Sequence, residues 1–248
     1  MTDDTTFARE GAVLYALDRG DGTPLVFLHG GLADHRAALM YVGALAGARR
    51  VITPDLRGSG RSRYAGALDW GLLAADVAGL LDHLDIERAF VGGTSAGSAV
   101  AARFALDFPE RLLGLVLVSP VYAGDWNDAQ QAAFAKMDEA GQRTLAEGIE
   151  ALRPLYAALP DPIRAAAIEM MLGFDPASVA ATTRLFASCA APFEGLEALA
   201  RIDAPALVIP GADPEHPAEV AALYAEHLRR ATTAEPATMA AAIEAFTR

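Results

Sequence analysis

Short runs of mainly apolar residues, each closed by a turn residue, constrain the fold of this 248-residue chain more than any other feature. Helical patterns separate these runs, and apolar runs this short are typical of strands in a parallel sheet that helices cover on both faces. The sequence therefore predicts one α/β domain with a mostly parallel central sheet flanked by helices. Residues 13–17 are a candidate antiparallel edge strand. The runs lie at 25–28, 50–53, 89–91, 115–118 and 206–209.

The helices expected between the strands have clear boundaries and apolar faces. Asp69 is the expected N-cap of a helix, because the apolar residues after it recur at helical spacing through Leu84. Residues 96–108 are small and apolar almost all round, as in a helix buried against a sheet, and Pro109 ends the pattern. Apolar stripes near the carboxyl end, after residue 219, predict two further helices.

One segment, residues 121–192, breaks the alternation of strands and helices. It shows helical patterns without a convincing strand, and several prolines divide it into short helices. We therefore predict a core formed by residues 1–120 and 193–248, with a helical cap at 121–192 inserted after the core strand 115–118. Ligands of open α/β sheets bind at the carboxyl ends of the strands, so a cap there would cover the site and exclude water.

The composition narrows the class of partner. The formal net charge is −12, and an acidic surface repels nucleic-acid phosphates and anionic lipid, which leaves a neutral or cationic small molecule as the expected partner. No apolar run approaches the ~20 residues of a membrane span. Cys189 is the only cysteine, and the acidic start at residues 1–4 is unlike a secretory segment. Both features favour a cytoplasmic location, and the oligomeric state stays open.

The pentapeptide G-T-S-A-G at 93–97 places Ser95 between an apolar run and the helix at 96–108. This G-x-S-x-G pattern is typical of a serine nucleophile in a sharp strand-to-helix turn, where small neighbours let strand and helix approach each other. The helix N-terminus also offers free N–H groups and a positive dipole end to a developing oxyanion. The alternative is a serine that only caps an ordinary helix.

A second glycine motif, His29-Gly30-Gly31, follows the run at 25–28. Its glycines let the backbone turn outward and present an N–H, so Gly31 and Ala96 are the expected donors of an oxyanion hole. The alternative is a simple turn that ends a strand. We expect His29 to brace this loop rather than to take part in catalysis.

Three stretches together resemble the α/β-hydrolase superfamily in order and spacing: FLHGG at 27–31, PDLRGSGRS at 54–62, and the serine pentapeptide. They are most similar to the branch of small esterases, lactonases and carbon–carbon bond hydrolases, and the resemblance extends from about residue 23 to residue 246. It implies the α/β-hydrolase fold and a structural role for the loop at 55–62. Relatives that open epoxides or remove halide carry aspartate at the elbow, so Ser95 implies acyl transfer through a covalent acyl-enzyme.

In this superfamily the acid and then the base follow the nucleophile along the chain. Asp213, in the loop after the run at 206–209, resembles the acid, although its loop is one residue shorter than the usual pattern. A turn-forming or helix-capping role is the alternative for Asp213, and Glu215 is a lesser candidate acid. The usual terminal histidine is missing, because residues 231–238 contain none and no histidine follows His227.

The base must therefore come from another position. His216 lies three residues after the candidate acid, on a loop expected to border Ser95, and is the first candidate. His35, just after the oxyanion loop, is the possible alternative base. His83 and His227 lie on predicted helices away from the motifs and are not expected to react. The alternative for His216 is an ordinary polar residue at the start of a helix.

Two functions are compatible with these residues. The first is a serine hydrolase of a small ester, thioester or lactone, with Ser95, Asp213 and His216 as catalytic residues and with no cofactor or metal. The second is a degenerate member that binds a small molecule or performs an elimination or cyclisation, which the missing terminal histidine favours. In the first case apolar residues around the cap would line the pocket, while some of them must instead hold the cap together. The candidates are Met137, Leu155, Tyr156, Met170, Met171, Phe174, Phe186 and Phe193.

Overall fold

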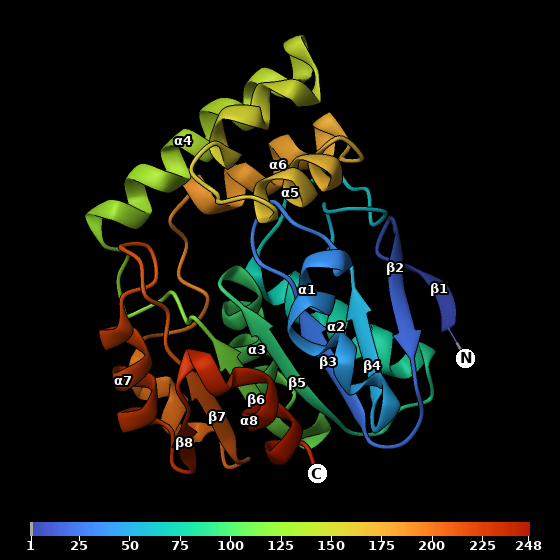
Figure 1. Cartoon of the computed structure of the whole chain (residues 1–248), viewed down its shortest axis with the longest axis vertical. Coiled ribbons are helices and arrows are strands. Elements are labelled where there is room, and N and C mark those ends of the chain that lie inside the picture. The colour runs from blue at the N-terminus through green and yellow to red at the C-terminus, as the bar shows by residue number, and fades with distance from the viewer. Residues whose placement is uncertain (1) are drawn as a thin grey trace.

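A computed structural model describes residues 2–248 and has one eight-stranded sheet at its centre (Figure 1). The strand order is β1-β2-β4-β3-β5-β6-β7-β8. β2 pairs antiparallel with both β1 and β4, and all the other neighbouring strands pair in parallel, which confirms the predicted mostly parallel α/β sheet. The strands are β1 (Thr2–Arg9), β2 (Ala12–Arg19), β3 (Pro24–Leu28), β4 (Arg50–Pro54), β5 (Ala89–Thr94), β6 (Leu112–Val118), β7 (Ala206–Ile209) and β8 (Ala231–Thr233).

Helices cover both faces of the sheet, because successive residues of each apolar strand point to opposite faces. In β3, Val26 and Leu28 belong to the core that includes α2 and α3, whereas Leu25 and Phe27 belong to the core that includes α1 and α8. The strands therefore read as continuously apolar, since both faces are buried. The helices that flank the sheet on its two faces are α1 (His35–Val42), α2 (Trp70–His83), α3 (Ala96–Asp107), α7 (Ala218–His227) and α8 (Met239–Phe246).

Two helices that flank the site have the boundaries that the sequence predicts. Asp69 caps α2 with its side chain, which accepts a hydrogen bond from the Leu72 N–H at 2.7 Å. α3 ends at Asp107, and Pro109 opens a single 3₁₀ turn before β6. That turn is η2 (Pro109–Arg111). The other 3₁₀ helices among the described residues are η1 (Gly43–Gly47), η3 (Ile149–Tyr156), η4 (Leu196–Arg201) and η5 (Pro236–Thr238).

The segment between β6 and β7 is helical and lies over one end of the sheet (Figure 1). It contains α4 (Asp128–Glu147), α5 (Ile163–Met171) and α6 (Pro176–Ala187), and the described part of 121–192 has no strand. Its helices share a small core of their own with Leu32, and the Tyr156 hydroxyl donates to the Leu32 carbonyl at 3.0 Å. That residues 121–192 form a cap separate from the core stays a prediction. None of the described helices is long and apolar enough to cross a bilayer.

Two strands differ from the sequence-based expectation. Residues 13–17 do lie in an antiparallel strand, but β1 pairs outside it, so β2 is not at the edge. A two-residue turn with positive φ at Glu10 and Gly11 joins these strands, and the polar composition of β1 hides it in the sequence. At the other edge, residues 231–233 form β8, and two of its three residues are exposed. An edge strand needs little apolar patterning because one of its sides faces solvent.

Candidate active site

Ser95 lies in the sharp turn between β5 and α3, with a left-handed backbone (φ 54°, ψ −123°) that side-chain-bearing residues rarely adopt. The turn closes because its neighbours are glycines. A Cβ on Gly97 would lie 2.5 Å from the carbonyl oxygens of Leu28 and His29, and one on Gly93 would lie 2.4 Å from the backbone of Gly97. The serine hydroxyl is thereby presented at the carboxyl end of the sheet, next to the N-terminus of α3.

Ser95, His216 and Asp213 form a continuous hydrogen-bonded chain. His216 Nε2 lies 2.8 Å from Ser95 Oγ. On the other side of the ring, His216 Nδ1 lies 2.8 Å and 3.0 Å from the two carboxylate oxygens of Asp213. With the Nδ1–H donating to Asp213, the lone pair of Nε2 is free to accept the Ser95 hydroxyl proton, which is the arrangement a general base requires.

Asp213 also shapes the turn that carries the histidine. One of its carboxylate oxygens accepts the backbone N–H groups of Glu215 and His216, each at 2.9 Å, and the His216 N–H also donates to the Asp213 carbonyl. Such side-chain-to-backbone bonds are the usual reason for aspartate in turns. The two interpretations of Asp213 are therefore compatible, because the turn it forms is what brings His216 beside it. The carboxylate is 58% exposed, and the histidine side chain is 18% exposed.

Glu215 has a different position from the one expected of an acid. Its backbone N–H donates to Asp213, and the residue lies at the lining of the cavity in front of Ser95. Among the described residues, the His216 Nδ1–H donates only to the carboxylate of Asp213. The structure thus brings Asp213, and not Glu215, to the histidine ring.

His35 lies in a second histidine–aspartate pair. Its backbone N–H and its Nδ1–H both donate to Asp55 Oδ1 at 2.7 Å, and both side chains are buried. Burial on its own would raise the pKa of the Asp55 carboxyl, but the hydrogen bonds that the His35 ring and the Arg61 N–H donate to it hold this pKa below its ordinary value. The described contacts of His35 fasten the start of α1 to the loop after β4, and its ring does not line the Ser95 cavity.

His29 braces the oxyanion loop, as the sequence predicts. It is fully buried, and its Nδ1–H donates to the Gly30 carbonyl at 2.7 Å while Nε2 accepts the Leu56 N–H at 3.0 Å. An imidazole that accepts a backbone N–H must be neutral. Burial lowers the pKa of His29 and keeps the ring in that state.

The two remaining histidines make contacts away from this site. His83 stacks on Phe7 and hydrogen-bonds to Thr5 of β1. His227 bonds to the carbonyl of Leu223 one turn earlier in α7. Neither ring borders the cavity at Ser95.

A cavity of about 240 Å³ opens in front of Ser95. Gly31 and Ala96 both line it, and Ala96, as the first residue of α3, has an N–H without an acceptor inside the helix. A side chain at position 31 would lie 2.9 Å from the ring of Phe186, so only glycine lets the oxyanion loop pack against α6. The other lining residues are Trp70, Val121, Trp126, Gln130, Phe134, Met137, Phe186, Glu215 and His216.

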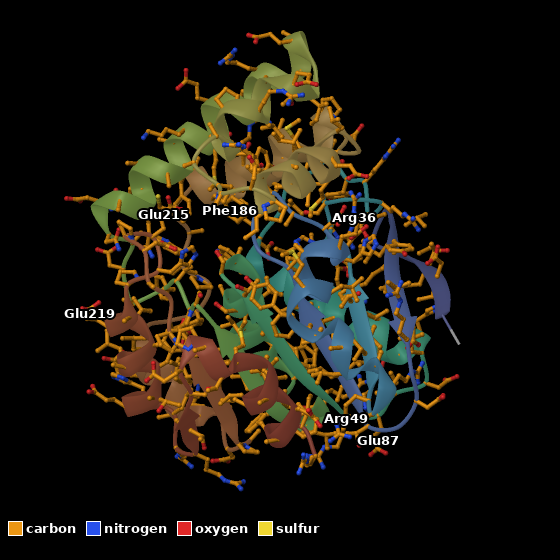
Figure 2. All side chains as sticks on the ribbon, viewed as in Figure 1. Arg36, Arg49, Glu87, Phe186, Glu215 and Glu219 are labelled. Atoms are coloured by element: carbon orange, nitrogen blue, oxygen red, sulfur yellow. The ribbon has the colours of Figure 1, made fainter. Side chains whose placement is uncertain are left out.

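Four aromatic residues among those that line the cavity contact one another. Each ring contacts two others, with centroids 5.1 to 6.5 Å apart, in the order Trp70, Trp126, Phe134, Phe186 and back to Trp70. In Figure 2, Phe186 and Glu215 lie near each other beneath the helices α4 and α6, while Glu219 points away at the outer edge. The aromatic wall that these four residues form therefore comes from α2 and from the helical segment between β6 and β7.

The apolar residues expected around the cap divide between the cavity and the core, as the two alternatives for them allow. Met137 and Phe186 line the cavity. The structure places Phe193 in the main core. Most of the other candidates lie in the separate core formed by the helical segment between β6 and β7, where Tyr156, Met170, Met171 and Phe174 are buried. Two of the lining residues that the list lacked, Gln130 and Phe134, had a signal in the sequence, because they recur with Met137 at the spacing of one face of a helix.

The charges around the cavity have one sign. Glu215 is the only acidic residue that lines it among the described residues, and no lysine or arginine does. Elsewhere, Asp34, His35 and Asp55 lie close enough together to suggest a metal site. Protein donors already occupy them, since Arg36 makes a two-oxygen contact with Asp34, and the Arg61 N–H donates to Asp55 at 2.7 Å. This cluster therefore fits a structural role in the loop.

Comparison with known proteins gives both local and whole-chain similarity. A family model described as alpha/beta hydrolase fold matches residues 23–160. The dihydrolipoyllysine-residue acetyltransferase component of the acetoin cleaving system of Cupriavidus necator is 41% identical over 115 residues, which cover 46% of this chain and 30% of that protein. The 2-hydroxy-6-oxo-2,4-heptadienoate hydrolase of Pseudomonas putida is 35% identical over 109 residues, which cover 42% of this chain and 40% of that protein. These matches thus span well under half the length of either relative.

The similarity in three dimensions extends over the whole chain. A solved structure of a thermophilic esterase from Thermogutta terrifontis, with malate bound, superposes with a TM-score of 0.77 and 26% sequence identity. The superposition covers 100% of this chain and 95% of that one. The fold is therefore similar to that of the esterase over the length of this chain.

Proposed function

The chain belongs to the alpha/beta hydrolase fold family, and from this premise we propose that it is a serine hydrolase of small, uncharged carboxylic esters, thioesters or lactones. The observation that carries the proposal is the 2.8 Å contact between His216 Nε2 and Ser95 Oγ, on a serine held in a strained elbow. A strained backbone at a solvent-accessible serine is costly, and such strain is concentrated at functional sites.

The reaction proceeds in two half-steps. Ser95 Oγ attacks the carbonyl carbon while His216 Nε2 takes its proton, and Asp213 stabilises the imidazolium that forms. The N–H groups of Gly31 and Ala96 hold the oxyanion of the tetrahedral intermediate. His216 then gives its proton to the leaving alcohol or thiol, and water, activated by the same ring, releases the acid from Ser95.

The cavity supports a substrate of modest size. A cavity of about 150 Å³ holds a benzene ring, so about 240 Å³ accommodates an aryl group or a short alkyl chain together with the reacting carbonyl. The aromatic wall binds an apolar group and leaves few polar contacts for a hydrophilic one. We propose that the helical cap supplies this wall and excludes water from the acyl-enzyme.

The charge of the cavity disfavours carboxylate substrates. A substrate carboxylate would meet Glu215 and find no arginine or lysine among the described lining residues to pair with. This distinguishes the proposed substrates from the dienoate named for the relative from Pseudomonas putida. We therefore expect neutral acyl and alcohol groups, with cationic groups tolerated near Glu215.

The second candidate is a member of the family that binds a small molecule or catalyses an elimination or cyclisation. The exposure of Asp213 favours it, because solvent weakens the interaction between the carboxylate and the imidazolium. The two candidates differ in one respect that can be measured, which is whether Ser95 becomes covalently modified.

A fluorophosphonate probe tests the proposal directly. We expect stoichiometric labelling of the wild-type protein and none in Ser95→Ala, with Ser188→Ala, an exposed serine at the end of α6, labelled like the wild type. The same three proteins are assayed with p-nitrophenyl butyrate and with an ester of similar size that carries a carboxylate on its acyl chain. Absence of labelling in a folded wild-type protein, or equal labelling in Ser95→Ala, would reject the serine hydrolase in favour of the second candidate.

A further inference from the structure

Gln130, near the start of α4, uses every hydrogen-bonding group of its side-chain amide. It is 2% exposed. Its Oε1 accepts the Asn127 N–H at 2.9 Å, and its Nε2 donates to the Val121 carbonyl at 2.6 Å and to the Glu215 carbonyl at 2.9 Å. One buried side chain thus joins the start of the cap helix, the exit from β6 and the loop that carries His216.

The choice of glutamine at this position is informative. In a helix capping box the third residue accepts the N–H of the N-cap residue, which glutamate does as well as glutamine. Glutamate would also interact favourably with the positive end of the helix dipole. Only glutamine, however, can donate two hydrogen bonds, and here both donors leave the helix for the carbonyls of Val121 and Glu215. Capping alone does not require this side chain.

The loop that receives this bond has few other supports. Residues 212–215 are exposed, and the turn is held from within by the bonds to the Asp213 carboxylate. Those local bonds set the shape of the turn but not its distance from Ser95. The bond to the Glu215 carbonyl ties the residue next to His216 to a buried point of the cap, with a weaker contact between Asn127 and the Pro214 carbonyl at 3.5 Å.

We propose that Gln130 is a positioning residue that holds His216 against Ser95 and couples the placement of the cap to the placement of the base. The inference rests on the proposed function of His216 as the base. In this chain the histidine lies on the acid loop and not before the last helix, so the base needs an anchor outside its own loop. The cap helix provides it, and a displacement of α4 would draw the base away from the nucleophile.

Gln130→Glu is the sharpest test, because it keeps the size of the side chain and the capping acceptor and removes the two donors. A protonated carboxyl retains one donor, whereas an ionised carboxylate has none and repels both carbonyl oxygens. We expect kcat for p-nitrophenyl butyrate to fall about tenfold or more near pH 8, with KM changed by less than about threefold. The ratio of variant to wild-type kcat should fall further as the pH is raised from about 5.5 to about 8.5.

Gln131→Glu is the matched control. Gln131 is the adjacent residue of α4, is exposed, and donates to the Trp126 carbonyl with no described bond to the His216 loop. We expect its kcat and its pH dependence to match the wild type. Thermal unfolding of both variants across the same pH range separates a loss of activity from a loss of folded protein.

A second readout is independent of turnover. The NMR resonances of the His216 imidazole, assigned by comparison with His216→Ala, should shift or broaden in Gln130→Glu and stay unchanged in Gln131→Glu. Unchanged His216 resonances, or a raised KM with unchanged kcat, would overturn the positioning role. If turnover persists in Ser95→Ala, the proposed function fails, and the resonances still decide whether Gln130 positions the ring.

Discussion

His216→Ala removes the imidazole next to Ser95 and leaves its loop in place. The loop keeps its shape because Asp213 still accepts the backbone N–H groups of Glu215 and of residue 216. The deleted ring is partly exposed and makes no described hydrogen bond beyond those to Ser95 and Asp213. We therefore expect the free energy of unfolding to change by less than about 1 kcal/mol.

The size of the kinetic effect follows from the geometry. A general base in hydrogen-bond contact contributes about 10²- to 10⁴-fold, or about 2.7 to 5.4 kcal/mol of transition-state stabilisation. The aspartate behind the ring is 58% exposed, so water screens its attraction for the imidazolium to about 1 kcal/mol, against about 4 kcal/mol for a more protected pair. We expect the lower half of the range, a fall of about 10²- to 10³-fold in kcat/KM.

The assay is steady-state hydrolysis of p-nitrophenyl butyrate together with the rate of fluorophosphonate labelling. Both rates should fall in parallel, because both require deprotonation of Ser95. Added imidazole should restore part of the activity of His216→Ala and leave the wild type unchanged. His83→Ala is the control, since His83 contacts Phe7 and Thr5 and not the cavity, and it should retain wild-type kcat/KM.

Equal turnover in His216→Ala and wild-type protein would refute the reasoning. If His35→Ala then abolished labelling in a protein that still folds, the role of base would pass to His35. A rise in KM without a fall in kcat would also count against a base, because it indicates lost binding of substrate and transition state alike.

Three further predictions concern stability, and denaturant unfolding measures each. Gly97→Ala should destabilise the fold by more than about 2 kcal/mol or distort the elbow, because the added Cβ would lie 2.5 Å from two carbonyl oxygens. A variant as stable as the wild type and fully labelled by the fluorophosphonate would contradict this. Tyr224→Phe should raise the free energy of unfolding by about 1 kcal/mol, since the buried hydroxyl has no hydrogen-bond partner within the described residues. A loss of stability would show that this hydroxyl does make a hydrogen bond. Burial lowers the pKa of His29 from its ordinary value of 6.5. Below pH 6.5 the His29 imidazole is therefore protonated in the unfolded chain but stays neutral in the folded protein. The free energy of unfolding should therefore fall by up to about 1.4 kcal/mol per pH unit as the pH drops below that value, and His29→Gln should flatten this slope, whereas His83→Gln should not.

The sequence alone determined the parts of the molecule that local pattern controls. The five apolar runs are strands because both faces of each are buried, and that requirement acts on every residue of the run. The elbow at Ser95 is readable because close approach of strand and helix demands small residues at consecutive positions. α2 can be predicted from its N-cap and α3 from its small, apolar residues, since both signals are local in the sequence.

Only the tertiary structure decided which side chains meet across the chain. The sequence offered His216 and His35 as bases, and each has an aspartate partner. The fold turns one pair toward Ser95 and buries the other between the start of α1 and the loop after β4. The sequence also did not show how the apolar residues between β6 and β7 divide between the cavity and a core of their own, or that Gln130 contacts the His216 loop. These contacts join residues up to 121 positions apart, and their geometry depends on how whole elements pack, which no local pattern encodes.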